Sequence, residues 1–407
     1  MAAALALLAL AWGADAPDGS IESYVAAALE QSPRVEAAFH RWQASVHAVA
    51  RERTLPEPTV SFGAFVQSVE TRVGPQQARV SVQQAFPWPT RLVQGGKAAR
   101  ATAEGAEAEL QATSLEVAAA VEVAFWSLWE VRQSEALHRE HLAVLEGLSA
   151  TVAARMETGT ASLADLQQVD LARARLDDTL ASLAAREAQQ QARLLASVGL
   201  RDGDTATTSE PEVAASGEVD ALIDRALAHP RLAALDASAR SAEHQARAMG
   251  GRRLPDLTVG ADWIVTGPAV MDTPDDGKDA VAVGVGVKVP LWQGTYGHDV
   301  AAARAREQAA RASERATGDQ LAAEVHALAA EVDDTARRVA LVQDTLLPQA
   351  EAAYTSLLGQ YTVGDAGVAQ TLLAQRDLLD LAVDRAAAQA DHQRAWARLH
   401  ALVGGAE

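Results

Sequence analysis

Apolar residues recur three or four positions apart over most of the chain, which is the spacing of one face of an α-helix. The residues between them are largely Ala, Glu, Gln and Arg. The pattern predicts one long helix over about 97–157 and another over about 298–359. At 1.5 Å per residue each would be roughly 90 Å long, so each needs an antiparallel partner along its length, as in a coiled coil or a helical barrel. The clearest apolar rows are Val121, Phe125, Leu128 and Val131; Leu163, Leu166 and Val169; and Leu176, Leu180 and Leu183.

Strict two-residue alternation replaces the helical spacing at four places. In AVAVGVGVKVPLW (280–292), valines stand at the odd-numbered positions from 281 to 289, and Ala, Gly or Lys stand at the even-numbered positions from 280 to 288. Stretches near 59–67, 79–86 and 258–266 alternate in the same way, with Phe65 and Gln84 as exceptions. The pattern predicts four strands, each with an apolar face and a polar or small face. The apolar positions are Val60, Phe62, Val80, Val82, Val259, Trp263, Val281, Val283, Val285 and Val287.

The apolar strand faces can meet either a protein core or lipid. A soluble antiparallel sheet would cover one face with its own core, but the predicted helices are too long to fold back over short strands. Strands of about 9 to 12 residues can cross a bilayer when tilted, and an apolar outside with a polar inside is typical of an outer-membrane barrel. We therefore predict that lipid covers these faces, with Trp88, Trp263 and Trp292 near the strand ends.

Four strands cannot close a barrel, and open strand edges are not tolerated in lipid. The missing strands must come from other copies of the chain, which predicts a cyclic, head-to-tail homo-oligomer. A trimer would have about twelve strands and a lumen wide enough for water.

The same order of elements occurs twice along the chain. Residues 27–65 correspond to 226–263, residues 80–101 to 283–305, and residues 156–176 to 361–381. Each copy predicts a helix, a β-hairpin and a long helical hairpin. We place the first repeat at 17–200, an acidic Ser/Thr/Gly-rich linker at 201–220, and the second repeat at 221–407.

The first 16 residues, with an apolar run to Trp12 and Ala14-Asp15-Ala16 behind it, predict a secretory signal peptide. No later segment approaches the ~18 apolar residues of a membrane-spanning helix.

Charge and composition exclude several classes of function. The chain has 407 residues, a net charge of −19 and no cysteine. The acidic balance argues against nucleic acid as a partner. The lack of cysteine excludes disulfides, thiolate metal sites and a cysteine nucleophile. An acidic conduit would favour cations.

Candidate catalytic and metal-binding motifs are weak. His138 and His141 lie three apart on a helix, and His40 and His47 share a helix face. No carboxylate completes a metalloprotease motif, so solvated helix faces explain these histidines better. No P-loop, Gly-x-Ser-x-Gly motif or nucleophile–base pair occurs. We predict no catalysis, no metal site and no cofactor.

The chain resembles the outer-membrane efflux (TolC-like) family of Gram-negative bacteria over about 21–404. The resemblance is carried by Leu55-Pro56 and Leu254-Pro255 at the strand entries, by AFPWPTRLVQGGKAA and KVPLWQGTYGHDVAAARA at the strand-to-helix returns, and by YTVGDAGVAQTLLAQ (361–375). It implies a mostly α homotrimer in which a twelve-strand transmembrane β-barrel continues into a periplasmic helical barrel. It also implies a passive exit duct that works with a periplasmic adaptor (membrane fusion protein) and an inner-membrane pump.

The resemblance further implies that the hairpin tips, 155–165 and 361–370, form the closed periplasmic end and meet the adaptor. Asp165 and Tyr361 match a family Asp and Tyr that can bond, so we expect them to form a latch. Gly367, Gln370 and Leu373 replace a basic residue and two constriction carboxylates of the family's best-known member, and Asp365 is a possible substitute carboxylate. The tip and docking residues that the resemblance assigns are Arg155, Gly159, Gly364 and Gly367.

Two readings of function remain open at this point. The first is an efflux or type I secretion duct, and FPWP after the second strand resembles heavy-metal branches of the family. The alternative is a soluble periplasmic coiled-coil scaffold or adaptor with a small β-domain.

Overall fold

The computed structural model describes residues 17–203, 205–271 and 274–404. The predicted signal peptide, residues 1–16, lies outside these residues. The chain forms two compact units, and each takes segments from both predicted repeats. The first unit consists of Met1–Ala38, Leu110–Pro230 and Gly318–Glu407, and the second of Phe39–Glu109 and Arg231–Thr317.

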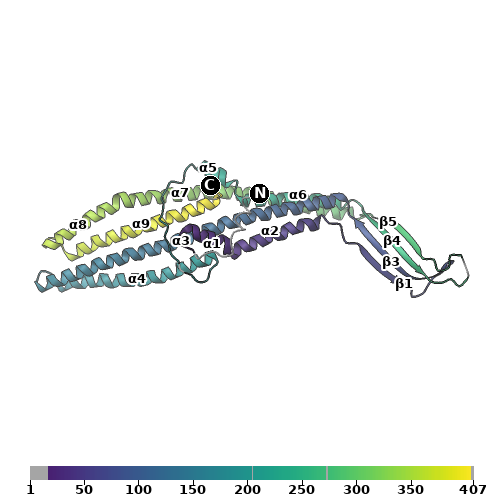
Figure 1. Cartoon of the computed structure of the whole chain (residues 1–407). Coiled ribbons are helices and arrows are strands. Elements are labelled where there is room, and N and C mark those ends of the chain that lie inside the picture. The colour runs from purple at the N-terminus through teal and green to yellow at the C-terminus, as the bar shows by residue number, and fades with distance from the viewer. Residues whose placement is uncertain (1–16, 204, 272–273, 405–407) are drawn as a thin grey trace. The chain divides into compact units, whose positions relative to one another are not determined.

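Two helical hairpins make up much of the first unit (Figure 1). One joins α3 (Pro89–Glu157) to α4 (Leu163–Val198), and the other joins α8 (Leu347–Val363) to α9 (Val368–Leu402). Both turns contain a glycine with positive φ, Gly159 at 77° and Gly364 at 93°, where a side chain would be strained. The long helical hairpin predicted for each repeat therefore turns at a glycine.

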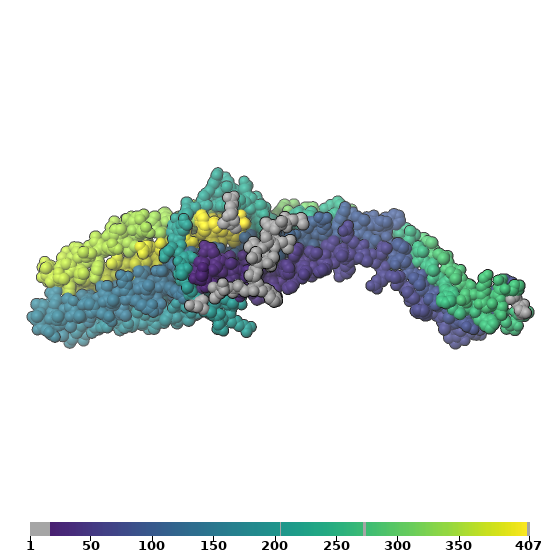
Figure 2. All heavy atoms as spheres, in the orientation of Figure 1, coloured from purple at the N-terminus to yellow at the C-terminus, as the bar shows by residue number. Residues whose placement is uncertain are grey.

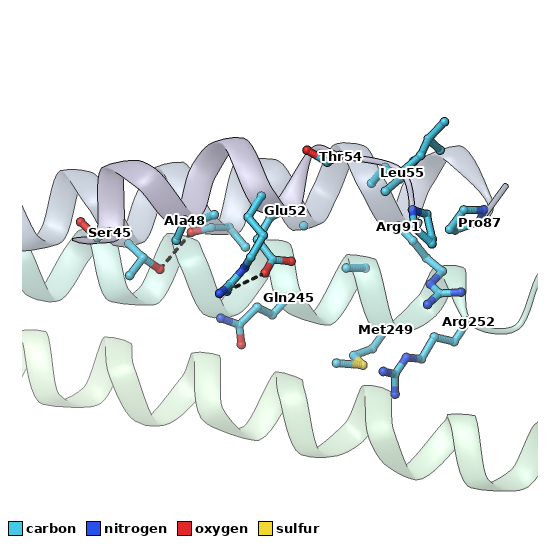
Figure 3. Close-up of a pocket in the computed structure, with 18 of the residues that line it drawn as sticks. Ser45, Ala48, Glu52, Thr54, Leu55, Pro87, Arg91, Gln245, Met249 and Arg252 are labelled. Carbon is cyan, nitrogen blue, oxygen red and sulfur yellow. Dashed lines mark hydrogen bonds and ion pairs between the residues drawn. The ribbon is translucent and has the colours of Figure 1, made fainter. Parts of the chain in front are cut away.

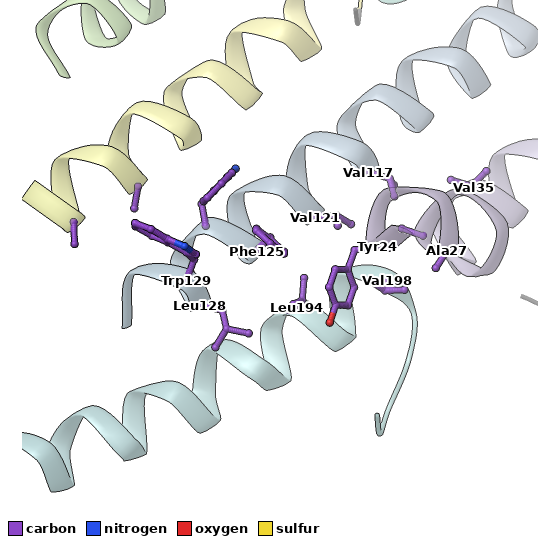
Figure 4. Close-up of a cluster of buried hydrophobic side chains, with 14 residues drawn as sticks. Tyr24, Ala27, Val35, Val117, Val121, Phe125, Leu128, Trp129, Leu194 and Val198 are labelled. Atoms are coloured by element: carbon purple, nitrogen blue, oxygen red, sulfur yellow. The ribbon is translucent and has the colours of Figure 1, made fainter. Parts of the chain in front are cut away.

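The helical apolar rows form the core of the first unit (Figure 4). Phe125 and Leu128 of α3 meet Leu194 of α4 and Tyr24 of α1 (Ile21–Gln31), and all four are fully buried or nearly so. Burying a Phe or Leu side chain stabilises the fold by about 1.5–3 kcal/mol. The core thus holds α1 against the α3–α4 hairpin.

The second predicted long helix is divided in the structure. α7 (Gln293–Leu341) is followed by a π-helical turn (Val342–Leu346) before α8 begins. The Leu347 amide donates to the Val342 carbonyl five residues back. Pro348, directly after it, has no amide hydrogen and cannot make the ordinary helical bond. This local irregularity corrects the prediction of an uninterrupted helix over 298–359.

The linker is ordered over most of its length and lies across the helices of the first unit. Figure 2 shows it as a teal band between the purple α1 and the yellow α9. Tyr24 donates its hydroxyl to the Ala206 carbonyl at 3.1 Å, and Ser216 donates its amide to Asp333 at 2.9 Å. Behind it, α5 (Val219–Ala226) packs its apolar face on α7 and α9. The linker has neither helical nor strand periodicity, but these hydrogen bonds to Tyr24 and Asp333 hold it against the helices.

The second unit contains the sheet and the helical segments that enter and leave it. The strands are β1 (Thr59–Ala64), β3 (Gly74–Phe86), β4 (Asp256–Thr266) and β5 (Ala280–Lys288), with a two-residue β2 (Glu70–Thr71) beside β3. They pair antiparallel in the order β1-β3-β4-β5.

Two helices of the second unit end just before the paired Leu-Pro motifs. α2 (Pro33–Glu52) stops ahead of Leu55-Pro56, and α6 (Pro230–Gly251) stops ahead of Leu254-Pro255. Proline disfavours helical conformation in the residue before it, which explains both endings. In the described part of the chain, every helix is too short or too polar to pass through a membrane.

Candidate functional site

The strand register places the predicted apolar residues on one face of the sheet. Phe62 lies opposite Val80, Val80 opposite Trp263, and Trp263 opposite Val281. A second row runs through Val60, Val82, Ala261 and Val283, and a third pairs Val259 with Val285. Leu257 and Val287 extend the face toward the strand ends. Period-two alternation on four separate strands therefore adds up to one continuous apolar surface.

This apolar face has no protein covering it in the described chain. Phe62 is 79% exposed and Val283 is 76% exposed. Val285, Val281 and Trp263 are also exposed. A contiguous exposed apolar face of this kind marks a surface that meets lipid or another protein.

The opposite face of the sheet is polar or small. Arg79 of β3 forms a 2.8 Å ion pair with Asp262 of β4, and the Ser81 hydroxyl donates to the same carboxylate. Gly260 and Gly284 lie opposite each other in the next row. The alternation on these strands is evident from the sequence, but the Arg79–Asp262 pair is not, because these residues are far apart along the chain.

Both outer strands have an open edge. β1 pairs only with β3 and β5 pairs only with β4 among the long strands of residues 17–203, 205–271 and 274–404. Backbone groups at such an edge can add a further strand. Because the four strands alternate in direction, β1 of one copy and β5 of another would meet antiparallel, as a closed barrel requires.

The hairpin tips meet through a small buried cluster. Leu148 and Val152 of α3 and Val169 of α4 pack against Tyr361 of α8 and Val368 of α9. These side chains belong to both hairpins, so the cluster joins one tip to the other.

Arg155 adds a polar contact between the two tips. Its guanidinium carbon lies 4.7 Å from the centre of the Tyr361 ring, and Nη1 donates to the Tyr361 carbonyl at 2.5 Å. A cation over an aromatic face contributes about 0.5–2 kcal/mol, depending on desolvation. Arg155 was predicted at the tip, but no pattern in the sequence pointed to Tyr361 as its partner.

The predicted latch residues have other partners within the chain. Asp165 accepts hydrogen bonds from the Ser162 amide at 2.9 Å and the Ser162 hydroxyl at 2.8 Å, and these bonds lower the pKa of its carboxyl. The Asp165 amide in turn donates to the Ser162 hydroxyl at 3.2 Å, and this reciprocal pair forms the capping box that begins α4. Tyr361 is only 4% exposed, and its buried hydroxyl has no hydrogen-bond partner in the described chain. The Asp165–Tyr361 latch stays a prediction.

The other tip residues shape the turn between α8 and α9. Gly364 ends α8, and its amide donates to the Gln360 and Tyr361 carbonyls. Gly367 precedes α9 and donates its amide to the Gln370 side chain at 3.4 Å. Asp365 is exposed. These positions give the tips their shape and leave the Asp365 carboxylate open to a partner.

A groove of about 770 Å³ lies in the second unit between α2, α3 and α6 (Figure 3). Small residues such as Ala48, Gly95 and Ala98 line it, together with Arg51 and Glu52. Among the residues that the structure describes, no group of three or more His, Asp or Glu side chains could hold a metal ion.

Comparison with known proteins places these features in context. Residues 222–405 match the family model of outer membrane efflux proteins. No curated protein sequence matches the chain. The predicted resemblance is therefore confirmed over residues 222–405.

Solved structures share the fold over nearly the whole chain. The outer membrane protein VceC from Vibrio cholerae superposes with a TM-score of 0.77 at 19% identity, covering 95% of this chain and 96% of that chain. A membrane protein from Pseudomonas aeruginosa gives 0.80 at 17% identity, covering 97% and 96%. CusC, whose structures concern transmembrane channel formation, gives 0.80 at 14% identity, covering 95% and 92%. The predicted fold class, mostly helical with a small sheet, is confirmed.

Proposed function

We propose that three copies of the chain assemble into an efflux channel. Residues 222–405 match the family model of outer membrane efflux proteins, and the fold is similar to that of solved outer-membrane channels. Each copy contributes four strands to a twelve-strand barrel in the outer membrane and its helices to a barrel in the periplasm. The channel is a passive exit duct for an inner-membrane pump, reached through a periplasmic adaptor.

The single observation that carries this proposal is the sheet with an exposed apolar face and two open edges. Exposing the apolar face to water costs free energy, and placing the open edges in lipid leaves their backbone groups without hydrogen bonds. Pairing β1 of each copy with β5 of the next satisfies the backbone groups at the open edges. Lipid then covers the valine face, and the face with Arg79 and Asp262 lines a water-filled lumen.

The hairpin tips form the periplasmic end of the proposed duct. Arg155 and Tyr361 hold the two tips of one copy together. The proposed latch joins Asp165 to Tyr361, whose buried hydroxyl has no hydrogen-bond partner in the described chain. Exposed Asp365 and the turns at Gly159 and Gly364 are the surface offered to the adaptor.

Metal ions are one candidate cargo and drugs are another. The FPWP segment, 86–89, carries the likeness to heavy-metal branches, and the net charge of −19 favours cations near the duct. Deleting the gene and measuring sensitivity to copper, zinc and a drug panel separates these cargoes.

Oligomeric state and conductance test the channel itself. We expect a trimer in detergent, recovery in the membrane fraction, and ion conductance after reconstitution in planar bilayers. A monodisperse single subunit in plain buffer, released without detergent, would instead support the soluble scaffold.

A further inference from the structure

A buried histidine holds the second half of the linker against the helices of the first unit. His392 of α9 is fully buried, and its Nε2 atom accepts a hydrogen bond from the Ala214 amide at 3.2 Å. On the other side of the ring, Nδ1 lies 3.2 Å from the Val332 carbonyl of α7. The imidazole ring therefore joins the linker, α7 and α9.

The hydrogen-bond partners of His392 determine which ring nitrogen carries a proton. A carbonyl oxygen can only accept, so Nδ1 must donate to Val332. A backbone amide can only donate, so Nε2 must offer its lone pair to Ala214. A second proton, on Nε2, would place one N–H group against another. The contact with the linker therefore requires a neutral ring.

The charges near the ring do not remove this requirement. Asp333 of α7 favours a charged ring, but burial of the ring has the larger effect and lowers the pKa of His392. The Asp333 carboxylate also accepts the Ser216 amide at 2.9 Å, so it already holds the linker. The other charged residues that flank the contacting positions are Glu331 and Asp334 of α7, Asp391 and Arg394 of α9, and Glu212 of the linker.

The first half of the linker is held by groups of a different kind. Arg132 of α3 donates to the hydroxyls of Thr205 and Thr207 at 3.2 and 3.3 Å. Thr208 donates its amide to the Gly19 carbonyl at 2.9 Å. An arginine keeps its charge at any pH at which the chain is folded, and the other groups do not titrate. The two halves of the linker should therefore respond differently to pH.

We propose that His392 is a pH-dependent anchor for the linker, and that a proton on Nε2 releases residues 211–217 from α7 and α9 while residues 205–209 stay bound. The linker runs from contacts on α1 and α3, in the first repeat, to contacts on α7 and α9, in the second. Release therefore removes a restraint between the two repeats. It does not depend on whether the chain forms a channel.

The size of the effect follows from the ordinary pKa of histidine, about 6.5, which the ring regains once the linker leaves. Protonation then favours the released state by a factor of about 1.1 at pH 7.5 and about 11 at pH 5.5. The ratio of released to bound linker should therefore rise about tenfold between these two pH values.

Hydrogen exchange measured by mass spectrometry on the full chain in detergent tests this expectation. After correction for the intrinsic pH dependence of exchange, the amides of Ala214 and Ser216 should lose about tenfold in protection from pH 7.5 to 5.5. The Thr208 amide, at the other half of the linker, should keep its protection and serves as the internal reference.

Two substitutions separate the anchor from a general effect of pH. His392→Gln keeps a side-chain oxygen that can accept the Ala214 amide but does not titrate, so the tenfold change should disappear. The readout is the ratio between the two pH values, so a linker that is looser at both still tests the anchor. The matched control, His400→Gln, replaces another histidine of α9 whose pKa is lowered by burial, and it should keep the tenfold change.

Three results would overturn the inference. The first is equal corrected protection of Ala214 and Ser216 at both pH values in the unaltered chain. The second is a loss at Thr208 as large as the loss at Ala214, which would indicate general loosening. The third is a tenfold change that persists in His392→Gln, which would assign the pH dependence to another group.

Discussion

Placing a charge on the valine face gives the sharpest test of what covers it. Val283 lies in the middle of β5, in a row with Ala261, Val82 and Val60, and its side chain points away from the protein. The neighbouring residue, Ala282, is opposite Asp262 on the other face. Val283→Arg and Ala282→Arg therefore put the same side chain on the same strand, one position apart, but on opposite faces.

The two variants should differ by several kcal/mol if lipid covers the valine face. An arginine at the bilayer midplane on the lipid face of a barrel costs about 2–4 kcal/mol per chain, and three chains multiply that cost to about 6–12 kcal/mol per trimer. At position 282 the arginine would face water and the Asp262 carboxylate, so its cost should be near zero. On a water-exposed face, both changes would usually stay within about 0.5 kcal/mol.

Folding into vesicles provides the measurement. Each variant is unfolded in denaturant, diluted into phosphatidylcholine vesicles, and titrated with guanidinium chloride while tryptophan fluorescence reports folding. We expect the Val283→Arg midpoint to fall well below the midpoint of Ala282→Arg. Membrane recovery of the two variants from cells should follow the same order.

Equal midpoints for the two variants would refute the reasoning. Val283 would then face water or another protein, and the open edges of the sheet would need a different explanation. A larger loss at position 282 would mean that the register or the assignment of the two faces is reversed.

Three further predictions concern the helical part of the chain. Arg155→Ala removes the ring contact and the hydrogen bond to Tyr361, at a cost of about 1–3 kcal/mol, and should raise single-channel conductance and antibiotic leakage. Asp165→Ala removes the Ser162 capping box, at about 1 kcal/mol of stability, and should raise conductance if the latch to Tyr361 exists. His392 is fully buried, and burial lowers its pKa. The folded chain should therefore lose stability as the pH falls below about 6.5, which thermal unfolding at pH 7.5 and 5.5 measures.

Each of these predictions has a control. Arg155→Lys keeps the charge but not the planar guanidinium, so it should fall between Ala and the unaltered chain. Asp165→Asn keeps an oxygen for the cap, so a conductance change shared by Asn and Ala would be due to the charge. Unchanged conductance in Asp165→Ala would remove the latch.

The histidine prediction depends on the sign of the pKa shift. The Nε2 atom of His392 accepts the Ala214 amide of the linker at 3.2 Å, which requires that nitrogen to be unprotonated. Asp333, close by, opposes the lowering of the pKa. Because the folded pKa lies below the unfolded value of 6.5, the unfolded chain takes up the proton first and gains stability as the pH falls. His392→Gln should lose less stability between pH 7.5 and 5.5, and an equal loss would contradict the assignment.

Local patterns were sufficient to predict the elements of this fold and their faces. Spacing of three or four predicts the buried row at Phe125 and Leu128, and alternation predicts the exposed row at Val281 and Val283. Gly364 and the Leu-Pro pairs mark turns and helix ends because they act on the backbone next to them. These features depend on residues close in sequence, so a single sequence carries them.

Contacts between distant segments were decided only by the tertiary structure. Arg155 and Tyr361, like Arg79 and Asp262, are separated by about half of the chain, and no spacing rule joins them. The path of the linker, the π-helical turn and the alignment of four strands into one apolar face also required the packed chain. Each of these features depends on which strands and helices lie side by side. That arrangement is determined by burial and hydrogen bonding over whole elements, and not by the residues adjacent in sequence.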